Sequence, residues 1–257
     1  MGYKVTVVTT LFNYKDYIPE TIESFLSQDF IESEMVIVDD GSTDGSKDAV
    51  LPYVRKNNER IRLFDLQKNY GYSTAKNVGI FYARSPMLVM LDADDLLMKN
   101  GISSRYQTMI NGGFNMVHAP ALKLGKNNII SEDFYPASQR AKAYRKEDGY
   151  KLIHAQGVMI KKTCHDIVGM YDESMKCSSD KEMWARCLTR LTIGFDYNPC
   201  ALYRIHPKQM HKSDWKMKNL NRLNKITHSK INSRRKSLKD IILLRDYVPP
   251  ESALEIK

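Results

Sequence analysis

The stretch Met87-Leu88-Val89-Met90-Leu91-Asp92-Ala93-Asp94-Asp95 decides the fold of this chain. Its five apolar residues come before three carboxylates, which is typical of a fully buried strand that ends in an acidic turn. A divalent cation relieves the repulsion among the carboxylates most simply, and hard oxygen ligands favour Mg²⁺ or Mn²⁺. In open α/β sheets, ligands gather at the carboxyl ends of the strands. The Asp-x-Asp pattern alone is weak, because a solvated turn has the same composition, so the rest of the chain must support it.

Strands and helices alternate throughout the part of the chain before this stretch. We expect strands over 5–10, 35–38 and 62–66, each followed by a helix with its apolar positions on one face. Asp16 is the expected cap of the first helix, and Pro52 should kink or restart the second. This alternation predicts a Rossmann-like, mostly parallel sheet flanked by helices. Because the carboxyl ends of parallel strands share one rim, four residues should meet there: Thr10, Asp40, Asn69 and Asp92.

The pattern is less regular after residue 100. We expect helices around 103–110, 163–168 and 180–189, and a largely helical segment beyond His206. The expected strands are shorter and cover 116–123, 128–130, 157–161, 194–197 and 201–205. Residues 131–150 are polar and give no assignment.

The charge of the chain is concentrated near its C-terminus. The 257 residues carry a net charge of +9, and the segment 208–245 alone holds twelve Lys or Arg against two Asp. The remainder is therefore nearly neutral. No apolar run is long enough to span a membrane, and the N-terminus lacks a signal-peptide pattern. The four cysteines form no Cys-x-x-Cys pair, so reduced thiols in the cytoplasm are expected rather than a zinc site.

Five separate pieces of the chain resemble, in order, the inverting family 2 nucleotide-sugar glycosyltransferases of the A-type (GT-A) fold. Three of them form donor-side loops: Thr9-Thr10-Leu11-Phe12-Asn13, Val38-Asp39-Asp40-Gly41-Ser42-Thr43-Asp44, and Asn69-x-Gly71 with Ala75-Lys76-Asn77-x-Gly79. The other two are Leu91-Asp92-Ala93-Asp94-Asp95, and Asp180-x-x-x-Trp184 with Arg186 followed by Tyr203-Arg204-x-His206. The resemblance implies a catalytic domain over 1–210, with a donor half (1–112) and an acceptor half (113–210). The charge pattern and the expected helix beyond His206 indicate a basic, helical C-terminal extension over 211–257.

The resemblance implies a donor site for a nucleotide sugar, with UDP as the expected nucleotide. Asp40 would accept a hydrogen bond from the uracil imide, and Phe12 would stack on the base unless it packs in the core. The other donor-site residues are Thr10, Asn13, Asn69, Lys76, Asp92 and Ala93. Loop capping is the alternative for Thr10 and Asn69. Lys76 stands where the family often has Arg, and it cannot make the bidentate contact of a guanidinium.

A Mn²⁺ or Mg²⁺ ion would stabilise the leaving diphosphate. Asp94 is its expected ligand, joined by His206 unless that histidine is structural, while Asp95 either joins the site or caps the next helix. Asp180 is the expected general base that deprotonates the acceptor hydroxyl, with a helix N-cap as the alternative. The residue before such a base is usually acidic in the family, and here it is Ser179.

The basic extension has three interpretations. Leu220, Leu223, Ile226 and Ile231 alternate with Lys and Arg, so the helix could lie on an anionic membrane surface that carries a glycan acceptor. The same charges could hold nucleic-acid phosphates, with a modified DNA base as the acceptor, or the helix could pack on the catalytic domain. The sequence leaves open a nucleotidyltransferase of similar sheet topology and a non-catalytic binding module. The expected location is the cytoplasm, at the inner face of the membrane.

Overall fold

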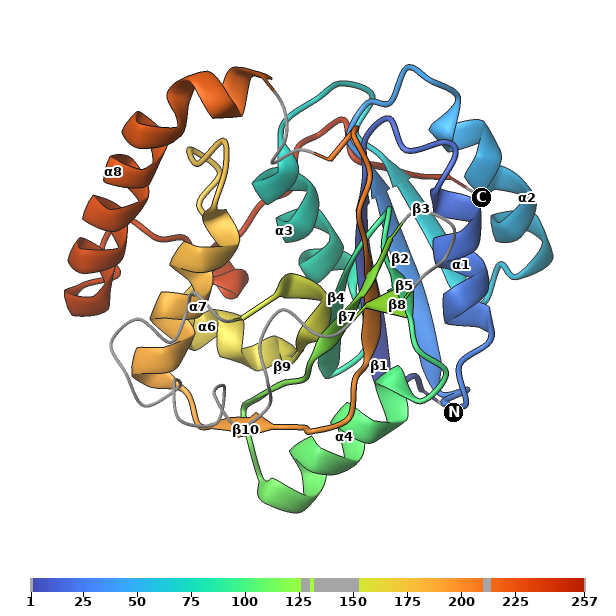
Figure 1. Ribbon diagram of the computed structural model, residues 1–257, viewed down its shortest axis with the longest axis horizontal. Coiled ribbons are helices and arrows are strands. Elements are labelled where there is room, and N and C mark those ends of the chain that lie inside the picture. Colours follow the sequence, from blue (N-terminus) through green and yellow to red (C-terminus); the bar gives the residue numbers. More distant parts are fainter. Residues whose placement is uncertain (1, 126–129, 132–152, 210–213, 257) are drawn as a thin grey trace.

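An 8-stranded sheet forms the centre of the molecule, in the order β10-β6-β9-β4-β1-β2-β3-β12 (Figure 1). The computed structural model describes residues 2–125, 130–131, 153–209 and 214–256. The strands are β1 Val5–Leu11, β2 Ser33–Asp39, β3 Ile61–Asp65, β4 Met87–Asp92, β6 Met116–His118, β9 Val158–Lys161, β10 Ile193–Phe195 and β12 Leu254–Ile256. All of them except β9 and β12 run in the same direction, which confirms the predicted mostly parallel sheet.

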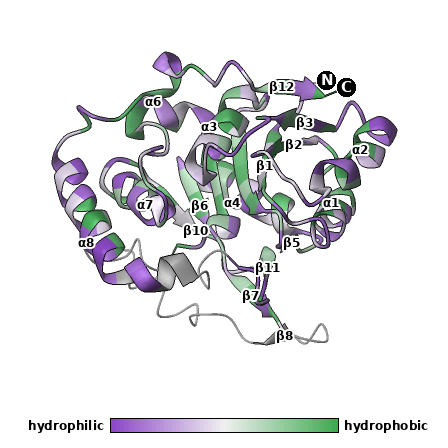
Figure 2. Ribbon diagram, turned by 90° about the horizontal axis from the view of Figure 1, so that it is seen from above, coloured by the Kyte–Doolittle hydropathy of each residue, from purple (hydrophilic) through white to green (hydrophobic). Residues whose placement is uncertain are grey.

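Helices cover both faces of the sheet because neighbouring strand residues point to opposite sides. Val7 of β1 packs with α1, α2 and α4, whereas Val8 packs on the other face, with α3, α6 and α7. The helices are α1 Ile18–Leu26, α2 Ser46–Lys56, α3 Tyr72–Tyr82, α4 Gly101–Gly112, α6 His165–Val168 and α7 Ser179–Arg190, with short 3₁₀ turns η3 Ala155–Gly157, η4 Lys162–Cys164 and η6 Leu244–Asp246. The central strands are the most hydrophobic part of the ribbon (Figure 2).

Helix α3 lies unusually close to the sheet at Gly79. A Cβ atom at this position would come within 2.3 Å of Val8 Cγ1, so only glycine permits the approach. The close contact fixes the height of α3 over β1 and therefore the position of the first turn of α3 at the carboxyl rim of the sheet.

A second, 4-stranded sheet projects from the body of the molecule (Figure 2). It has the order β5-β11-β7-β8, with β5 Leu96–Leu97, β11 Ala201–Arg204, β7 Ala121–Leu124 and β8 Ile130–Ser131. Strand β5 follows the acidic turn after β4 directly, so this small sheet attaches the end of β11 to that turn.

The C-terminal segment contains one long helix and one short strand. Helix α8 (Asp214–Lys236) packs along α7, and β12 pairs antiparallel with β3 at the edge of the central sheet. Among the described residues, no helix is long and apolar enough to cross a membrane. All four cysteines are buried, and none of them forms a disulfide.

Most predicted elements are confirmed, and three expectations are wrong. Helix α2 does not restart at Pro52 but continues through it, because the missing N–H of Pro52 leaves unpaired only the carbonyl of the exposed Asp48. The strand expected over 116–123 is split between the two sheets, because Pro120 cannot donate to a ladder. Tyr17, and not Asp16, is the N-cap residue of α1, and it makes no side-chain cap. The region 131–150, left unassigned from the sequence, lies almost wholly outside the described residues.

Candidate active site

The carboxyl ends of β1, β2 and β4 lie level with one another. Thr10 is in register with Asp92, and the backbone N–H of Asp40 donates to the Leu11 carbonyl at 2.8 Å. The predicted common rim is therefore confirmed for Thr10, Asp40 and Asp92. Asn69 lies exposed on the loop before α3, which also reaches this rim.

Asp40 connects two of the rim loops. Its carboxylate accepts the backbone N–H of Tyr70 at 2.7 Å and that of Gly71 at 2.9 Å. Burial raises the pKa of Asp40 to about 6, although the two backbone hydrogen bonds oppose this shift. Each carboxylate oxygen keeps a second lone pair, so Asp40 can still accept one more hydrogen bond from a ligand.

The loop after β1 is held against the loop after β2. Asn13 has a left-handed backbone (φ 58°), its N–H donates to Ser42 Oγ at 3.0 Å, and its Oδ1 accepts the N–H of Thr43 at 2.8 Å. This bracing uses the Asn13 side chain for the loop itself. Phe12, by contrast, is 42% exposed, so the alternative that it packs in the core is wrong.

Two side chains of α3 donate hydrogen bonds to Asp92. Its Oδ1 accepts the Tyr72 hydroxyl at 3.0 Å and the Lys76 ammonium at 3.2 Å. The Lys76 side chain is fully buried and lies 4.8 Å from the centre of the Tyr72 ring, whereas the Asp92 side chain keeps 28% of its surface exposed. Because a buried ammonium needs an anionic partner, Lys76 supports the position of Asp92, which itself faces the rim. Ala93 is buried, and its carbonyl accepts the Thr21 hydroxyl at 2.8 Å.

Asp94 and His206 form a close pair from distant parts of the chain. Asp94 Oδ2 lies 2.9 Å from His206 Nε2, and the histidine ring lies against Tyr17 with 4.3 Å between ring centres. Burial and the neighbouring Asp92 raise the pKa of Asp94, while His206 opposes the shift. The pair therefore places a carboxylate oxygen and an imidazole nitrogen, both possible metal ligands, side by side just after β11.

Asp95 does not cap a helix, so that expectation is wrong. It is completely buried, and its Oδ1 accepts the backbone N–H of Arg204 at 2.9 Å. Strand β5 follows it directly, and α4 begins only at Gly101. The Arg204 Nε also donates to the Asp94 carbonyl at 2.9 Å, so β11 fastens the acidic turn on its backbone side.

Asp180 lies in the first turn of α7, after the N-cap residue Ser178, so the N-cap alternative for Asp180 is wrong. Its Oδ2 is 3.3 Å from the hydroxyl of Tyr72, which is also 3.0 Å from Asp92 Oδ1. Burial, followed by the charges of Asp180 and Asp92, raises the pKa of Tyr72 well above its ordinary value, so the hydroxyl keeps its proton. Two carboxylates separated by 88 positions in the chain are thus within reach of one hydrogen-bond donor.

Carboxylate oxygens suit Mn²⁺ or Mg²⁺, and Asp94 and the exposed Asp92 supply them, with the imidazole nitrogen of His206 beside Asp94. Within the described ranges, no group of three or more His, Cys, Asp or Glu side chains is ready to enclose a metal ion. This arrangement fits an ion that is held by one or two protein ligands and completed by water and substrate phosphates. It does not fit a closed structural site.

Two residues of the site were missed from the sequence. Tyr72 follows Gly71 without any motif of its own, and Gln209 accepts the His206 N–H at 3.3 Å while donating to the Arg204 carbonyl at 2.6 Å.

Two residues of the acceptor-side motif lie in the protein interior. Trp184 and Arg186 are buried, and Arg186 pairs with Glu182 at 2.8 Å. The backbone N–H of His154 donates to the buried His118 at 3.2 Å.

Comparison with known proteins identifies the family. The description "Glycosyl transferase family 2" matches residues 6–159, which is more than half of the chain. The chain belongs to this family. The protein named "Putative teichuronic acid biosynthesis glycosyltransferase TuaG" from Bacillus subtilis is 28% identical over 218 residues, or 82% of this chain and 83% of TuaG. The glycosyltransferase GlyG from Streptococcus pneumoniae is 33% identical over 107 residues, but the match spans only 35% of that protein.

Solved structures show that the family 2 glycosyltransferase has the GT-A fold. S. aureus TarS in complex with UDP-GlcNAc superimposes with a TM-score of 0.71 at 18% identity, over 88% of this chain and 66% of the TarS chain. The mannosyltransferase PcManGT from Pyrobaculum calidifontis, in complex with GDP-Man and Mn²⁺, gives a TM-score of 0.69 at 16% identity, over 98% of this chain and 67% of that chain. Family membership sets aside the nucleotidyltransferase and the non-catalytic binding module.

Proposed function

We propose that the protein transfers a sugar from a UDP-sugar to a hydroxyl group of a glycan, with inversion at the anomeric carbon and with Mn²⁺ or Mg²⁺ as cofactor. The main support for this proposal is the position of the Tyr72 hydroxyl, which lies 3.0 Å from Asp92 and 3.3 Å from Asp180. An inverting displacement needs a base on the acceptor side and charge stabilisation on the donor side. The two carboxylates that would serve these needs lie on either side of one hydroxyl.

Donor binding would use the rim loops. Asp40 would accept the uracil imide N–H, Phe12 would stack on the base, and Thr10 and Asn69 would contact the base or ribose. Asn13 and Lys76 would act indirectly, since one braces the loops and the other supports Asp92. Asp94 and His206 would hold the metal ion, with Asp92 and the backbone at Ala93 beside it. When bound, a divalent cation would offset the negative charge that develops on the departing diphosphate.

Asp180 would act as the general base. Its carboxylate accepts the proton of the acceptor hydroxyl as the acceptor oxygen forms its bond to the anomeric carbon. The bond from that carbon to the diphosphate oxygen breaks in the same displacement, and the nucleoside diphosphate leaves with the bonding pair. Location in the first turn of α7 favours the ionised form of Asp180, as a base requires.

One comparison supports a glycan as the acceptor. TuaG matches over 83% of its own length, and its name places it in teichuronic acid biosynthesis. The location that we propose is the cytoplasm, at the inner face of the membrane, and the buried free thiols are consistent with a reducing compartment. A modified DNA base is the alternative acceptor. In this proposal residues 1–210 form the catalytic domain, with donor half 1–112 and acceptor half 113–210, and 211–257 form the basic extension.

The decisive test is the substitution Asp180→Asn, which keeps the shape of the side chain and removes the base. We expect the transfer rate to fall by about 10³-fold, in the range for a lost general base, while UDP affinity measured by calorimetry stays unchanged. Asp48→Asn makes the same chemical change on the exposed face of α2 and serves as the control. Equal transfer rates in the wild type and Asp180→Asn would remove Asp180 from the mechanism.

A donor screen tests the substrate assignment. Hydrolysis of a panel of UDP- and GDP-sugars is measured with Mn²⁺, and then repeated with added polysaccharide and with duplex DNA. We expect one UDP-sugar to be turned over, and polysaccharide to convert hydrolysis into transfer. Stimulation by duplex DNA alone would favour the DNA acceptor.

A further inference from the structure

A groove lies between helix α8 and the loop that leads into α7, with a volume of about 320 Å³. Figure 1 shows this loop rising between α8 and α3. One wall contains Met175, Lys176 and Cys177, and the opposite wall contains Arg222, Leu223 and Ile226. The groove therefore combines aliphatic and sulfur-containing side chains with two cations.

The loop that forms one wall of the groove also contacts the proposed reaction centre. The carbonyl of Met175, in this wall, accepts the Ser73 hydroxyl at 3.5 Å. Ser73 follows Tyr72, whose hydroxyl is 3.3 Å from Asp180, and Asp180 itself lies three positions after Cys177. A ligand in the groove would thus lie against the loop that leads to the carboxylate that would deprotonate the acceptor.

The two cations of the groove are not neutralised by the acidic residues of the same loop. Asp172 is already paired with Lys230 at 2.5 Å and with Arg234 at 2.7 Å, in the second half of α8. Glu173 accepts the amide of Asn77 at 2.9 Å. The first half of α8 therefore contributes positive charge to the groove while the second half fastens the loop.

The lining favours one kind of ligand over the others. Among the nine lining residues that the structure describes, none is aromatic, whereas sequence-tolerant binding of single-stranded nucleic acid and its bases relies on aromatic stacking. Flexible thioether and branched aliphatic side chains suit a hydrocarbon chain, and Lys and Arg suit a phosphate group. Ile226 is 41% exposed and Leu223 is half-buried, so apolar surface remains for a ligand to cover.

We propose that this groove binds the lipid phosphate on which the acceptor sugar is carried, with Lys176 and Arg222 at the phosphate and Met175, Leu223 and Ile226 along the start of the hydrocarbon chain. This inference rests on the proposed transferase function and specifies its acceptor. It also gives the two halves of α8 different tasks, since Lys230 and Arg234 hold the loop and Arg222 binds the ligand.

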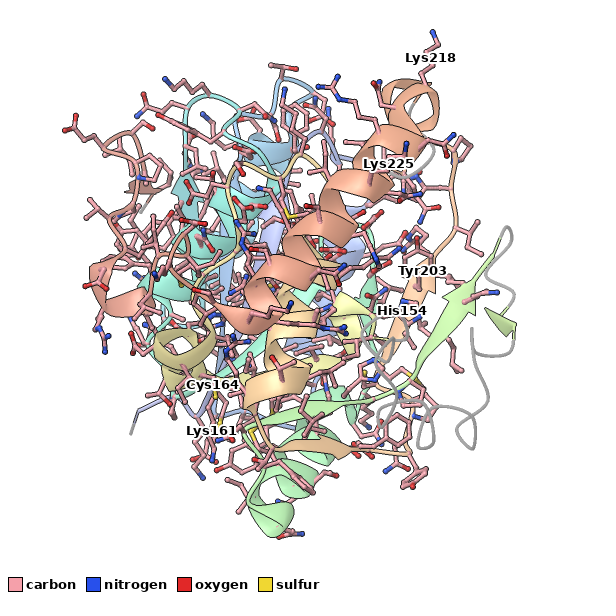
Figure 3. All side chains as sticks on the ribbon, turned by 90° about the vertical axis from the view of Figure 1, so that its left-hand side faces the viewer. His154, Lys161, Cys164, Tyr203, Lys218 and Lys225 are labelled. Carbon is pink, nitrogen blue, oxygen red and sulfur yellow. The ribbon has the colours of Figure 1, made fainter. Side chains whose placement is uncertain are left out.

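The test uses the full chain and vesicles of phosphatidylcholine that contain a long-chain isoprenyl phosphate. Vesicles with phosphatidylglycerol at equal charge are the comparison, and binding is measured by co-sedimentation. The double substitution Lys176→Gln with Arg222→Gln removes the groove cations. Its matched control is Lys218→Gln with Lys225→Gln, which removes two exposed cations of α8 that do not line the groove. Figure 3 shows Lys218 extending away from the body of the molecule.

We expect the wild type to prefer isoprenyl phosphate vesicles over phosphatidylglycerol vesicles. Loss of the two groove cations should weaken binding to isoprenyl phosphate about thirtyfold and abolish the preference, since each cation near an anionic headgroup contributes about 1 kcal/mol. The control variant should keep the preference. Equal binding to both vesicle types, equal losses in both double variants, or stronger binding to duplex DNA with the same dependence on the groove cations would each overturn the inference.

UDP-sugar binding without vesicles separates this inference from the function on which it rests. We expect all variants to bind the donor like the wild type. If the wild type fails to bind any nucleotide sugar, the proposed transferase function fails. If donor binding is normal and the vesicle preference is absent, only the groove assignment fails.

Discussion

The two sides of the candidate site are fastened in different ways. The loops after β1 and β2 hold each other through hydrogen bonds of Asn13 with Ser42 and Thr43, some 30 positions apart. The loop before α7 is instead held by the charges of Lys230 and Arg234, which lie about 60 positions away on α8. The proposed donor side is thus held by loops of the central sheet, whereas the proposed acceptor side is held by the C-terminal helix. Variants of the two regions should therefore separate donor binding from acceptor use.

The largest effect should come from Asp94→Ala, on the donor side. In the proposed site, this change would remove an oxygen ligand of the metal ion, and several kcal/mol of charge stabilisation in the transition state would be lost with it. We expect transfer to fall by about 10³-fold and UDP affinity to fall only when Mn²⁺ is present. Calorimetry with Mn²⁺ and with a chelator provides the internal control. Normal turnover with an ordinary dependence on Mn²⁺ would contradict the assignment.

The substitution Asp172→Asn should break the acceptor side without affecting the donor side. Burial disfavours the charge of Asp172, but hydrogen bonds from Lys230, Ser174 and Arg234 outweigh this and hold its pKa below the ordinary value. Because the folded-state pKa is lowered, this stabilisation is present at neutral pH and is lost as the pH falls below the ordinary Asp value of 3.8.

We expect Asp172→Asn to cost about 2 kcal/mol of the free energy of unfolding at neutral pH, less than for a fully buried pair. It should also raise KM for the acceptor and leave UDP affinity unchanged. Denaturant unfolding and steady-state kinetics measure the two effects. Asp240→Asn, on the exposed segment after α8, is the control. A matching loss of UDP affinity would show that the two sides are not independent.

A pH dependence should distinguish the donor side. In the proposed donor site, the ionised form of Asp40 would accept the uracil N–H more strongly than the neutral form, and burial raises the pKa of Asp40 to about 6. UDP affinity should therefore fall about tenfold between about pH 7 and about pH 5, and Asp40→Asn should bind more weakly with a flat profile. The raised pKa also means that ionisation of Asp40 lowers the free energy of unfolding as the pH rises from 3.8 to about 6. An unchanged pH profile in Asp40→Asn would exclude Asp40 as the titrating group.

The smallest effect should come from Tyr72→Phe, which removes the hydroxyl that lies between the two sides. A single hydroxyl hydrogen bond contributes about 1 kcal/mol, so we expect kcat to fall about fivefold with little change in UDP affinity. The closely placed Tyr70→Phe removes a hydroxyl that instead contacts Ser252 at 2.9 Å, and it serves as the control. An equal loss in both variants would indicate a general effect on the loop before α3.

The donor side could be predicted from the sequence because its determinants are local. Apolar strands ending in Asp40 and Asp92 are enough to place these residues on one rim of a parallel sheet. Lys76 was expected at the donor, yet its burial under Asp92 depends on how closely α3 packs, which no local pattern reports.

The remaining features depend on contacts between distant parts of the chain. Asp is a common residue type at helix caps, but the side chain of Asp95 accepts a hydrogen bond from the backbone N–H of Arg204, 109 positions away. Tyr72 belongs to no motif. It is part of the site because α7, which packs beside α3, brings Asp180 within 3.3 Å of its hydroxyl. The ion pairs of Asp172 similarly require the position of α8, and from the sequence its packing on the catalytic domain was one of three interpretations, with no partner residue named.

The pairing of β12 with β3 has a practical consequence for handling the protein. Residues 254–256 cover the hydrogen-bonding edge of β3, and Arg62 of that strand is 2.5 Å from Glu255. Deleting these residues would expose a row of unpaired amides and carbonyls, to which another polypeptide can add as a strand. An expression vector should therefore keep this segment intact and carry its purification tag at the N-terminus, to guard against oligomers that form by edge-to-edge association.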